Sequence, residues 1–317
     1  MKFHILLATT SMLALAACGG SGDSDLGGGG GGGGGDGGGG GGGGTGTDAT
    51  VLPGSDTCEG AFVCNETLLA VSYNDGGTPG DLTDDIVQIQ GTPFDETPDG
   101  ATYVYAGTTS SGYVDLAGHA AFVNDEFGVD ATPFNNYLAL FATASDSSIS
   151  VGQSRVMDGY RDRGYGGVFY VLNEAGNLPE NQLATYSGQY AGILITLGPS
   201  GGANQQTSGD VDLWVDFTDS YVKGWVTNRT TVGGEALNGL IFDDSTPITA
   251  GAFQGNAIGF DADDGEEWSG TYWGVFAGGE GAPTIGGGFE VSGSDDGFPD
   301  VDLIEVGTFI AEKDFGS

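Results

Sequence analysis

Residues 209–229 read GDVDLWVDFTDSYVKGWVTNR, and this pattern indicates two antiparallel β-strands joined by a tight turn. Apolar and polar side chains alternate on both sides of Asp219-Ser220, as they do in strands whose two faces meet different surroundings. If these two residues form the turn, Trp214 lies opposite Trp225 and Asp216 lies opposite Lys223. A shift by one residue would lose both the aromatic pair and the charge pair, so the sequence favours this register.

The two faces of this hairpin have different expected environments. Leu213, Val215 and Phe217 share one face, which we expect to point into the core. Trp214 and Trp225 share the other face, and two exposed Trp side chains would need cover. The N-terminal half of the chain is one source of cover. The alternative is a partner, because Trp is a strong anchor residue in interfaces. Trp214 and Trp225 are therefore the candidate ligand- or partner-binding residues.

Alternation of this kind recurs through residues 56–317, which predicts an all-β fold. Many short antiparallel strands form a sandwich or a barrel, and eight candidates in the second half suit a closed barrel. Asn177–Glu180 is the expected boundary between the halves. The candidate strands are 68–73, 85–90, 101–108, 113–116, 137–142 and 166–172 in the first half, and 183–197, 209–217, 221–227, 236–242, 252–260, 268–277, 284–291 and 304–312 in the second.

The first residues indicate export. Residues 1–17 carry a positive charge at Lys2, an apolar centre and small residues, which is typical of a secretory signal peptide. The tetrapeptide Leu15-Ala-Ala-Cys18 is similar to a lipobox, in which Cys18 becomes the lipidated N-terminus. The alternative is an ordinary cleavable signal with an incidental Cys. Gly19 follows, and by similarity to bacterial lipoproteins it favours the outer membrane.

Residues 18–55 are expected to form a flexible tether. They hold two long glycine runs, 27–35 and 37–44, and glycine has the largest conformational freedom. The root-mean-square reach of such a coil is about 35 Å. This length suits a leash through a surface sugar layer and equally a spacer that faces the periplasm.

Cys58 and Cys64 follow the tether. Two Cys remain after lipidation in an exported chain, so we expect them to form one disulfide. Closing so short a loop would contribute about 2 kcal/mol. The spacing excludes a redox-active CxxC pair.

The expected domains of the chain are 1–17 signal peptide, 18–55 tether, 56–180 β-rich domain and 181–317 eight-stranded barrel.

Charge and composition exclude several function classes. The chain has 44 Asp+Glu against 7 Lys+Arg, a formal net charge of -37, which argues against nucleic acid or anionic lipid as a partner. Removal of the signal leaves His119 as the single His, which argues against His-dependent catalysis and multi-His metal sites. We expect His119 to be a structural or surface residue. The acidic loops 261–267 and 295–302 are interpreted as solvated hairpin loops, with calcium binding as the alternative.

The second half resembles the β-barrel domain of transferrin-binding protein B and its relatives, the factor H-binding and hemophilin-type surface lipoproteins. The likeness spans about 183–314 and rests on several short stretches in the family's order. These are 186–192 (YSGQYAG), 209–217 (GDVDLWVDF) with 222–229 (VKGWVTNR), 270–274 (GTYWG), 285–289 (IGGGF) and 307–311 (GTFIA). The resemblance implies that residues 56–180 correspond to the family's β-rich handle domain.

The same resemblance has functional implications. It implies a surface lipoprotein exported through a Slam-type translocon, in some cases with a TonB-dependent receptor as partner. The chain departs from the family where Val275-Phe-Ala277 replaces a Pro-containing stretch and where Thr284 stands in place of an acid. It also holds one barrel of this kind where transferrin-binding protein B has two lobes. Transferrin itself is therefore not the expected ligand.

Three function classes follow from the sequence. The leading hypothesis is a non-enzymatic, lipid-anchored outer-membrane protein that captures a host or environmental protein or a metal or haem carrier, without a cofactor of its own. The alternative is an acidic structural or adhesive envelope lipoprotein without a specific nutrient ligand. A periplasmic hydrolase would need a deep pocket with two carboxylates of different pKa.

Overall fold

The computed structural model describes residues 47–51, 70–74, 76–78, 81–90, 101–109, 112–124, 137–158, 163–198, 201–260, 268–295 and 298–314. All of them belong to one compact unit, Gly42–Ser317. Their regular structure is β-strand apart from two short 3-10 turns, Leu82–Asp84 and Ala106–Thr108. The all-β prediction is confirmed. In this part of the chain no helix is long and apolar enough to cross a membrane.

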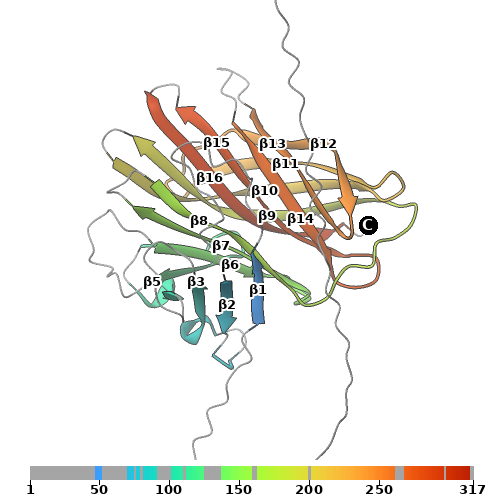
Figure 1. Cartoon of the computed structure of the whole chain (residues 1–317), viewed down its shortest axis with the longest axis horizontal. Coiled ribbons are helices and arrows are strands. Elements are labelled where there is room, and N and C mark those ends of the chain that lie inside the picture. Colours follow the sequence, from blue (N-terminus) through green and yellow to red (C-terminus); the bar gives the residue numbers. More distant parts are fainter. Residues whose placement is uncertain are drawn as a thin grey trace, which may run out of the picture. The chain divides into compact units, whose positions relative to one another are not determined.

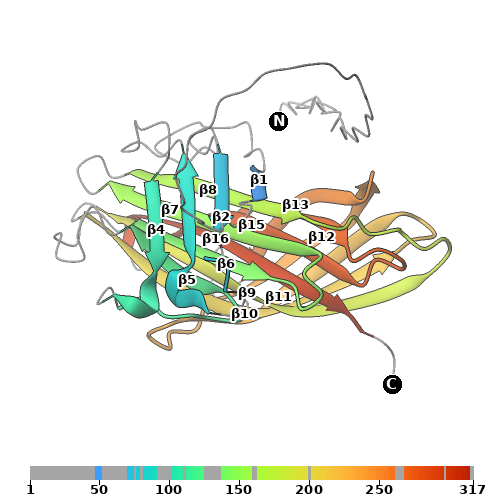
Figure 2. The same ribbon diagram turned by 90° about the horizontal axis from the view of Figure 1, so that it is seen from below.

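The strands form two closed barrels (Figures 1 and 2). The first barrel contains β1 (Thr47–Val51), β2 (Ala70–Asn74), β3 (Ile86–Gln90), β4 (Ala101–Tyr105), β5 (Ala120–Asn124), β6 (Tyr137–Thr143), β7 (Ile149–Asp158) and β8 (Arg163–Leu172). The second contains β9 (Leu183–Gly198), β10 (Gly201–Asp216), β11 (Tyr221–Thr231), β12 (Gly239–Thr249), β13 (Ala252–Phe260), β14 (Ser269–Ala277), β15 (Thr284–Asp295) and β16 (Phe298–Lys313).

The first barrel is more complete than the sequence indicated. It closes because β1 pairs with β2 on one side and with β8 on the other. β1 lies within residues 18–55, the range expected to be tether, so strand structure begins at Thr47 and not after residue 55. Strands β5 and β7 were also not predicted. The expected strand 113–116 is absent from the structure, where Leu116 forms only an isolated bridge with His119.

The second barrel confirms the predicted eight-stranded antiparallel fold. Strands β9 to β16 follow one another around it, and β9 closes the ring by pairing with both β10 and β16. Each of the eight predicted strands is present, and 252–260 matches β13 at both ends. The connection from β8 to β9 contains Asn177–Glu180, where the boundary between the halves was expected.

The register of the β10–β11 hairpin corrects the prediction. Trp214 pairs with Lys223, and Trp225 pairs with Asp212. The turn is longer than two residues, because the Asp216 carboxylate accepts hydrogen bonds from the backbone N–H groups of Thr218 and Asp219 at 2.8 and 3.1 Å. The slip is two residues, an even number, so Trp214, Trp225 and the apolar residues on the opposite face keep their predicted faces. Leu213, Val215 and Phe217 are buried as expected.

Aromatic side chains fill the second barrel. The rings of Phe242 and Tyr272 stack with centroids 4.2 Å apart, and Tyr190 meets Phe289 edge-on at 5.1 Å. Fully burying one such side chain contributes about 1.5–3 kcal/mol. The interior is thus a packed core, and partner contacts have to be sought on the outside.

The first barrel covers one part of the outer surface of the second. Side chains of β5 and β6 pack against outward-facing residues of β9, among them Ile193 and Ile195. The Gln153 side chain donates to the Ala191 carbonyl at 3.0 Å, and Thr284 donates to the Asp146 carboxylate at 3.1 Å. Among the described residues the first barrel does not cover the Trp214/Trp225 face, contrary to that expectation, and its cover lies over β9 and its neighbours.

Candidate partner-binding surface

An exposed apolar row crosses the outside of the second barrel. Trp225 on β11 pairs with Ile241 on β12, and Ile241 pairs with Ile258 on β13. All three point outward, with side chains 42%, 39% and 50% exposed. Cross-strand neighbours lie about 4.5–5.5 Å apart, so the three side chains form one continuous strip. We call Trp225, Ile241 and Ile258 the apolar row.

Trp214 lies beside the row and is partly covered by its own hairpin. The Lys223 ammonium is 4.7 Å from the centre of the Trp214 ring, and the Tyr221 ring centroid is 5.5 Å from it. The two Trp residues share a face as predicted but do not form a pair. Trp214 is half-buried by these contacts, and Trp225 is the more accessible of the two.

Acidic side chains border the apolar row. Asp212 lies directly opposite Trp225 on β10, and Asp243 lies two residues beyond Ile241 on β12. Both are exposed. Asp210 also lies on this face, where it accepts a hydrogen bond from the Asn228 amide at 2.8 Å. The apolar row is therefore bordered by negatively charged side chains.

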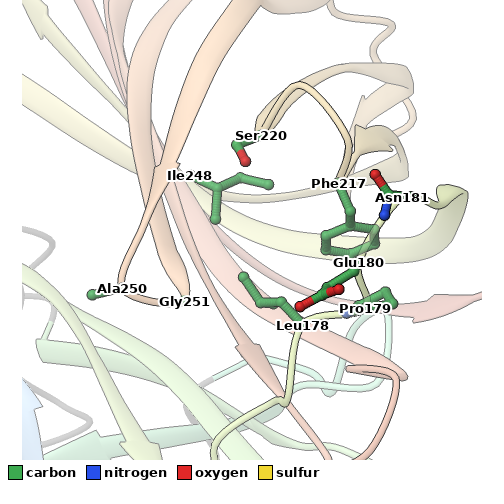
Figure 3. Close-up of a pocket in the computed structure, with 9 residues that line it drawn as sticks. All are labelled: Leu178, Pro179, Glu180, Asn181, Phe217, Ser220, Ile248, Ala250 and Gly251. Carbon is green, nitrogen blue, oxygen red and sulfur yellow. The ribbon is translucent and has the colours of Figure 1, made fainter.

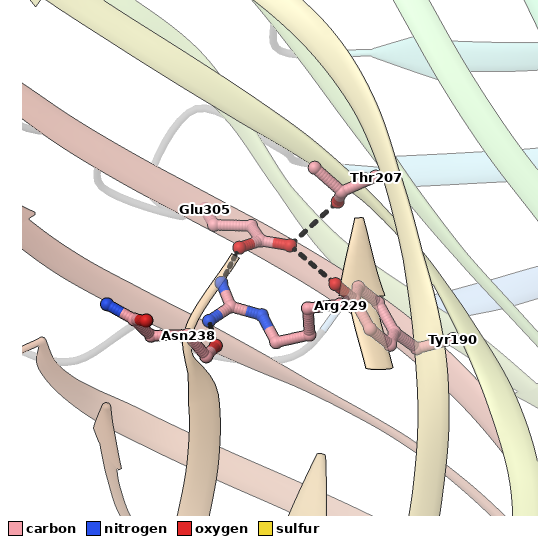
Figure 4. A network of polar contacts seen from close by, with 5 residues as sticks. All are labelled: Tyr190, Thr207, Arg229, Asn238 and Glu305. Atoms are coloured by element: carbon pink, nitrogen blue, oxygen red, sulfur yellow. Dashed lines mark hydrogen bonds and ion pairs between the residues drawn. The ribbon is translucent and has the colours of Figure 1, made fainter. Parts of the chain in front are cut away.

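A buried ion pair lies inside the same barrel (Figure 4). The Arg229 guanidinium donates to the Glu305 carboxylate and to the Asn238 carbonyl. The other Glu305 oxygen accepts hydrogen bonds from Thr207 at 2.7 Å and Tyr190 at 3.1 Å. Both charged side chains are 0% exposed. Arg229 belongs to the sequence stretch 222–229, in which no local pattern indicates a role for it.

The environment of this pair sets its charge states. Burial disfavours the charge on Arg229, but the negative charge of Glu305, the neighbouring Tyr190 and the hydrogen bonds to both together outweigh it and raise the pKa of Arg229 above its ordinary value. Burial, with the charge of Glu305, raises the pKa of Tyr190. The pair is closed off from solvent and fully engaged in holding strands together, so we interpret it as structural.

A cavity of about 530 Å³ lies at one end of the second barrel (Figure 3). It forms where the β8–β9 connection meets the β10–β11 and β12–β13 turns. Figure 3 shows the apolar side chains of Phe217, Leu178 and Ile248 on its wall, with the Glu180 carboxylate beside them. Its lining residues are Leu178, Pro179, Glu180, Asn181, Phe217, Ser220, Ile248, Ala250 and Gly251. Glu180 is the carboxylate among these lining residues.

His119 is a buried structural residue. Its side chain is 1% exposed, and Nδ1 lies 3.0 Å from the Ala117 carbonyl oxygen. Burial lowers the pKa of His119 to about 4, although the contact with Ala117 acts in the opposite direction. The imidazole is therefore neutral at neutral pH.

This burial predicts a pH-dependent stability. In the unfolded chain His119 takes up its proton near its ordinary pKa of 6.5, whereas in the folded chain it does so only near pH 4. The unfolded state binds more protons between these values, so stability falls as the pH falls. Replacing His119 by Phe should remove about 2 kcal/mol of this loss between pH 7.5 and pH 5. Urea unfolding of both proteins at pH 7.5 and pH 5 tests this prediction. An equal loss of unfolding free energy in the two proteins would contradict it.

Several predicted sites lie outside the described residues. These are Cys18, Cys58 and Cys64, and the acidic loop 261–267. Their lipidation, disulfide and solvation stay predictions. Within the described residues no group of three or more His, Cys, Asp or Glu side chains is placed to hold a metal ion.

No family model matches the chain, and no curated protein matches its sequence significantly. Solved structures of transferrin-binding protein B are similar in fold. A single-substitution mutant from Haemophilus parasuis Hp5 has a TM-score of 0.42 and 16% identity, over 74% of this chain and 44% of that one. Intact Ap-TbpB, with N and C lobes, has a TM-score of 0.38 and 14% identity, over 62% of this chain and 38% of that one.

A double mutant from Haemophilus parasuis Hp5 has a TM-score of 0.42 and 16% identity, over 69% of this chain and 40% of that one. The chain thus spans about two fifths of the length of these proteins. What they bind as whole proteins is not transferred to it by a likeness of this size. The likeness to these structures is therefore partial and is one of fold alone.

Proposed function

We propose that this chain is a non-enzymatic, lipid-anchored protein of the outer-membrane surface that captures a host or environmental protein or a metal or haem carrier. The apolar row carries the proposal. Large apolar side chains left exposed side by side on a folded barrel are typical of protein interaction sites. The lipobox ending at Cys18 and the glycine-rich tether support an anchored position, in which a Slam-type translocon and a TonB-dependent receptor are the proposed partners.

The interior of the second barrel supports binding in preference to catalysis. Its buried charged groups, Arg229 and Glu305, are engaged with each other and shielded from solvent. Its aromatic side chains are packed against one another. A partner therefore has to be bound by the outer surface, where contacts form without a chemical step.

Protease treatment of intact cells that express the full chain tests the surface location. Digestion of the domain on intact cells is expected. Protection until the outer membrane is broken would contradict the surface role and move the domain to the periplasm.

Cells that express the Trp225→Glu chain are expected to retain at least tenfold less ligand than cells that express the unchanged chain, because the substitution places a charge in the apolar row. Val114→Glu is the matched control, since Val114 is also exposed, at 46%, but precedes β5 in the first barrel. Capture is measured by quantifying the ligand that cells retain from host fluid or rich medium. Equal capture by both variants would remove the row from the binding site, and concentration-dependent self-association without capture would favour an acidic structural or adhesive role.

A further inference from the structure

The spacing of the apolar row fits one kind of partner element. Its three side chains stand on three adjacent strands, which are about 4.8 Å apart. The row therefore runs across the strands and extends for about 10 Å between Trp225 and Ile258. An α-helix rises about 5.4 Å per turn, so apolar residues at i, i+4 and i+7 along one face have nearly the same spacing. A helix laid across the strands would place one apolar side chain near each member of the row.

The charges around the row determine which charged side chains that helix should carry. Asp212 lies next to Trp225 at one end, and Asp243 lies beside Ile241. The nearest described cation, Lys223, is held over the Trp214 ring, and Arg229 is buried inside the barrel. Lys or Arg side chains that flank the apolar stripe of a helix would meet these carboxylates. Acidic flanks would be repelled by them.

The described part of the fold leaves this surface open. The first barrel packs against β9 and other strands, and not against β11 to β13, among the described residues. Ile241 and Ile258 remain 39% and 50% exposed although β-branched side chains of this size are usually buried. A helix bound across these strands would cover both side chains.

We propose that the apolar row of β11–β13 binds an amphipathic helix of a partner protein whose apolar stripe is flanked by Lys or Arg. This inference rests on the proposed binding function and names the chemistry of the partner. Trp225 contributes an aromatic anchor near one end of the helix. Ile241 and Ile258 contact the following turns, and Asp212 and Asp243 pair with its basic side chains.

The test uses the purified full chain and a synthetic peptide. The probe is a Lys-rich helical peptide of about 18 residues with Leu at i, i+4 and i+7 on one face. A second peptide has the same composition and charge in an order that breaks the stripe. Binding is followed by calorimetry and by Trp emission, because Trp225 lies in the row and Trp214 beside it, while Trp268 and Trp273 are only 4% and 8% exposed.

We expect the amphipathic peptide to bind at least tenfold more tightly than the reordered peptide and to shift Trp emission to shorter wavelength. Ile241→Glu and Ile258→Glu should each remove this difference, whereas Val114→Glu should keep it. Asp212→Asn with Asp243→Asn should weaken binding and reduce its dependence on salt. Circular dichroism and the urea midpoint of each variant show that it is folded.

Three outcomes would overturn the inference. Equal binding of both peptides would show that net charge alone attracts them. Unchanged binding by Ile241→Glu would place the contact elsewhere. A dimer of the full chain that Ile241→Glu dissociates would assign the row to a second copy. The proposed function fails by a different result, namely protection of the domain on intact cells, so the two failures are distinguishable.

Discussion

Replacing Glu305 by Gln is expected to lower the free energy of unfolding by about 3–5 kcal/mol, because it leaves the Arg229 charge buried without its counter-ion. The substitution keeps the size of the side chain. Its carbonyl oxygen can still accept from Thr207 and Tyr190, as the carboxylate does. Its amide N–H₂ would then face the Arg229 N–H groups, donor against donor. The loss therefore comes from charge and donor pattern, not from a cavity.

Urea unfolding at pH 7 measures this effect. Glu280→Gln is the matched control, since Glu280 is exposed and the same chemical change there should alter stability by less than about 0.5 kcal/mol. The double replacement Arg229→Met with Glu305→Leu removes both charges and should recover most of the loss. If the Glu305→Gln protein were as stable as the control, the buried Arg229 charge would not need Glu305 as its counter-ion. The structural interpretation of the pair in Figure 4 would then be wrong.

Sequence patterning could not predict this ion pair because a β-bulge changes the faces of β11. Val226 points inward, so strict alternation would point Arg229 outward. Instead Asn228 adopts a left-handed φ of 52°, and Asn228 with Arg229 together oppose Gly209 on β10. The extra residue turns Arg229 into the core, where it is 1% exposed. The period-two pattern predicts faces well only between such irregularities.

The sequence predicted the second barrel better than the first. The strands of the second barrel are long and strongly patterned, so each of the eight was recognised. The strands β1 to β5 have five residues each, too few for alternation to stand out from chance. β1 also follows the glycine runs, and its place in the barrel depends on pairing with β8, more than a hundred residues away. Such long-range pairing has no local signal.

The candidate binding residues show a similar division. Alternation placed Trp214 and Trp225 on the outer face correctly, because face depends only on local periodicity. The pairing was wrong by two residues because the turn geometry depends on how Asp216 accepts backbone hydrogen bonds. Ile241 and Ile258 were not singled out. They join Trp225 only through the registers of β11–β12 and β12–β13, which a single strand does not reveal.

Replacing Gly270 by Ala is expected to destabilise the chain by about 3 kcal/mol. A Cβ atom at Gly270 would lie 1.8 Å from the Glu290 carbonyl oxygen and 2.7 Å from the Val291 Cα. Both are backbone atoms of β15, with which β14 pairs along the whole length of β14. A flexible side chain could move aside, but here the two strands would have to separate. The glycine in the Gly270–Gly274 motif is thus required by the close approach of two strands in a tightly coiled small barrel.

Gly233→Ala separates this steric effect from the general cost of changing glycine. Its added Cβ would meet nothing closer than the Thr231 hydroxyl at 3.5 Å, so it should be neutral or stabilise by less than about 1 kcal/mol through loss of freedom in the unfolded chain. Urea unfolding of both variants at one pH gives the comparison. If Gly270→Ala were as stable as Gly233→Ala, β14 and β15 could separate without a loss of stability, and barrel closure would not require glycine at this position. A large loss at Gly270 with none at Gly233 would instead make the strand approach the reason that this motif contains glycine.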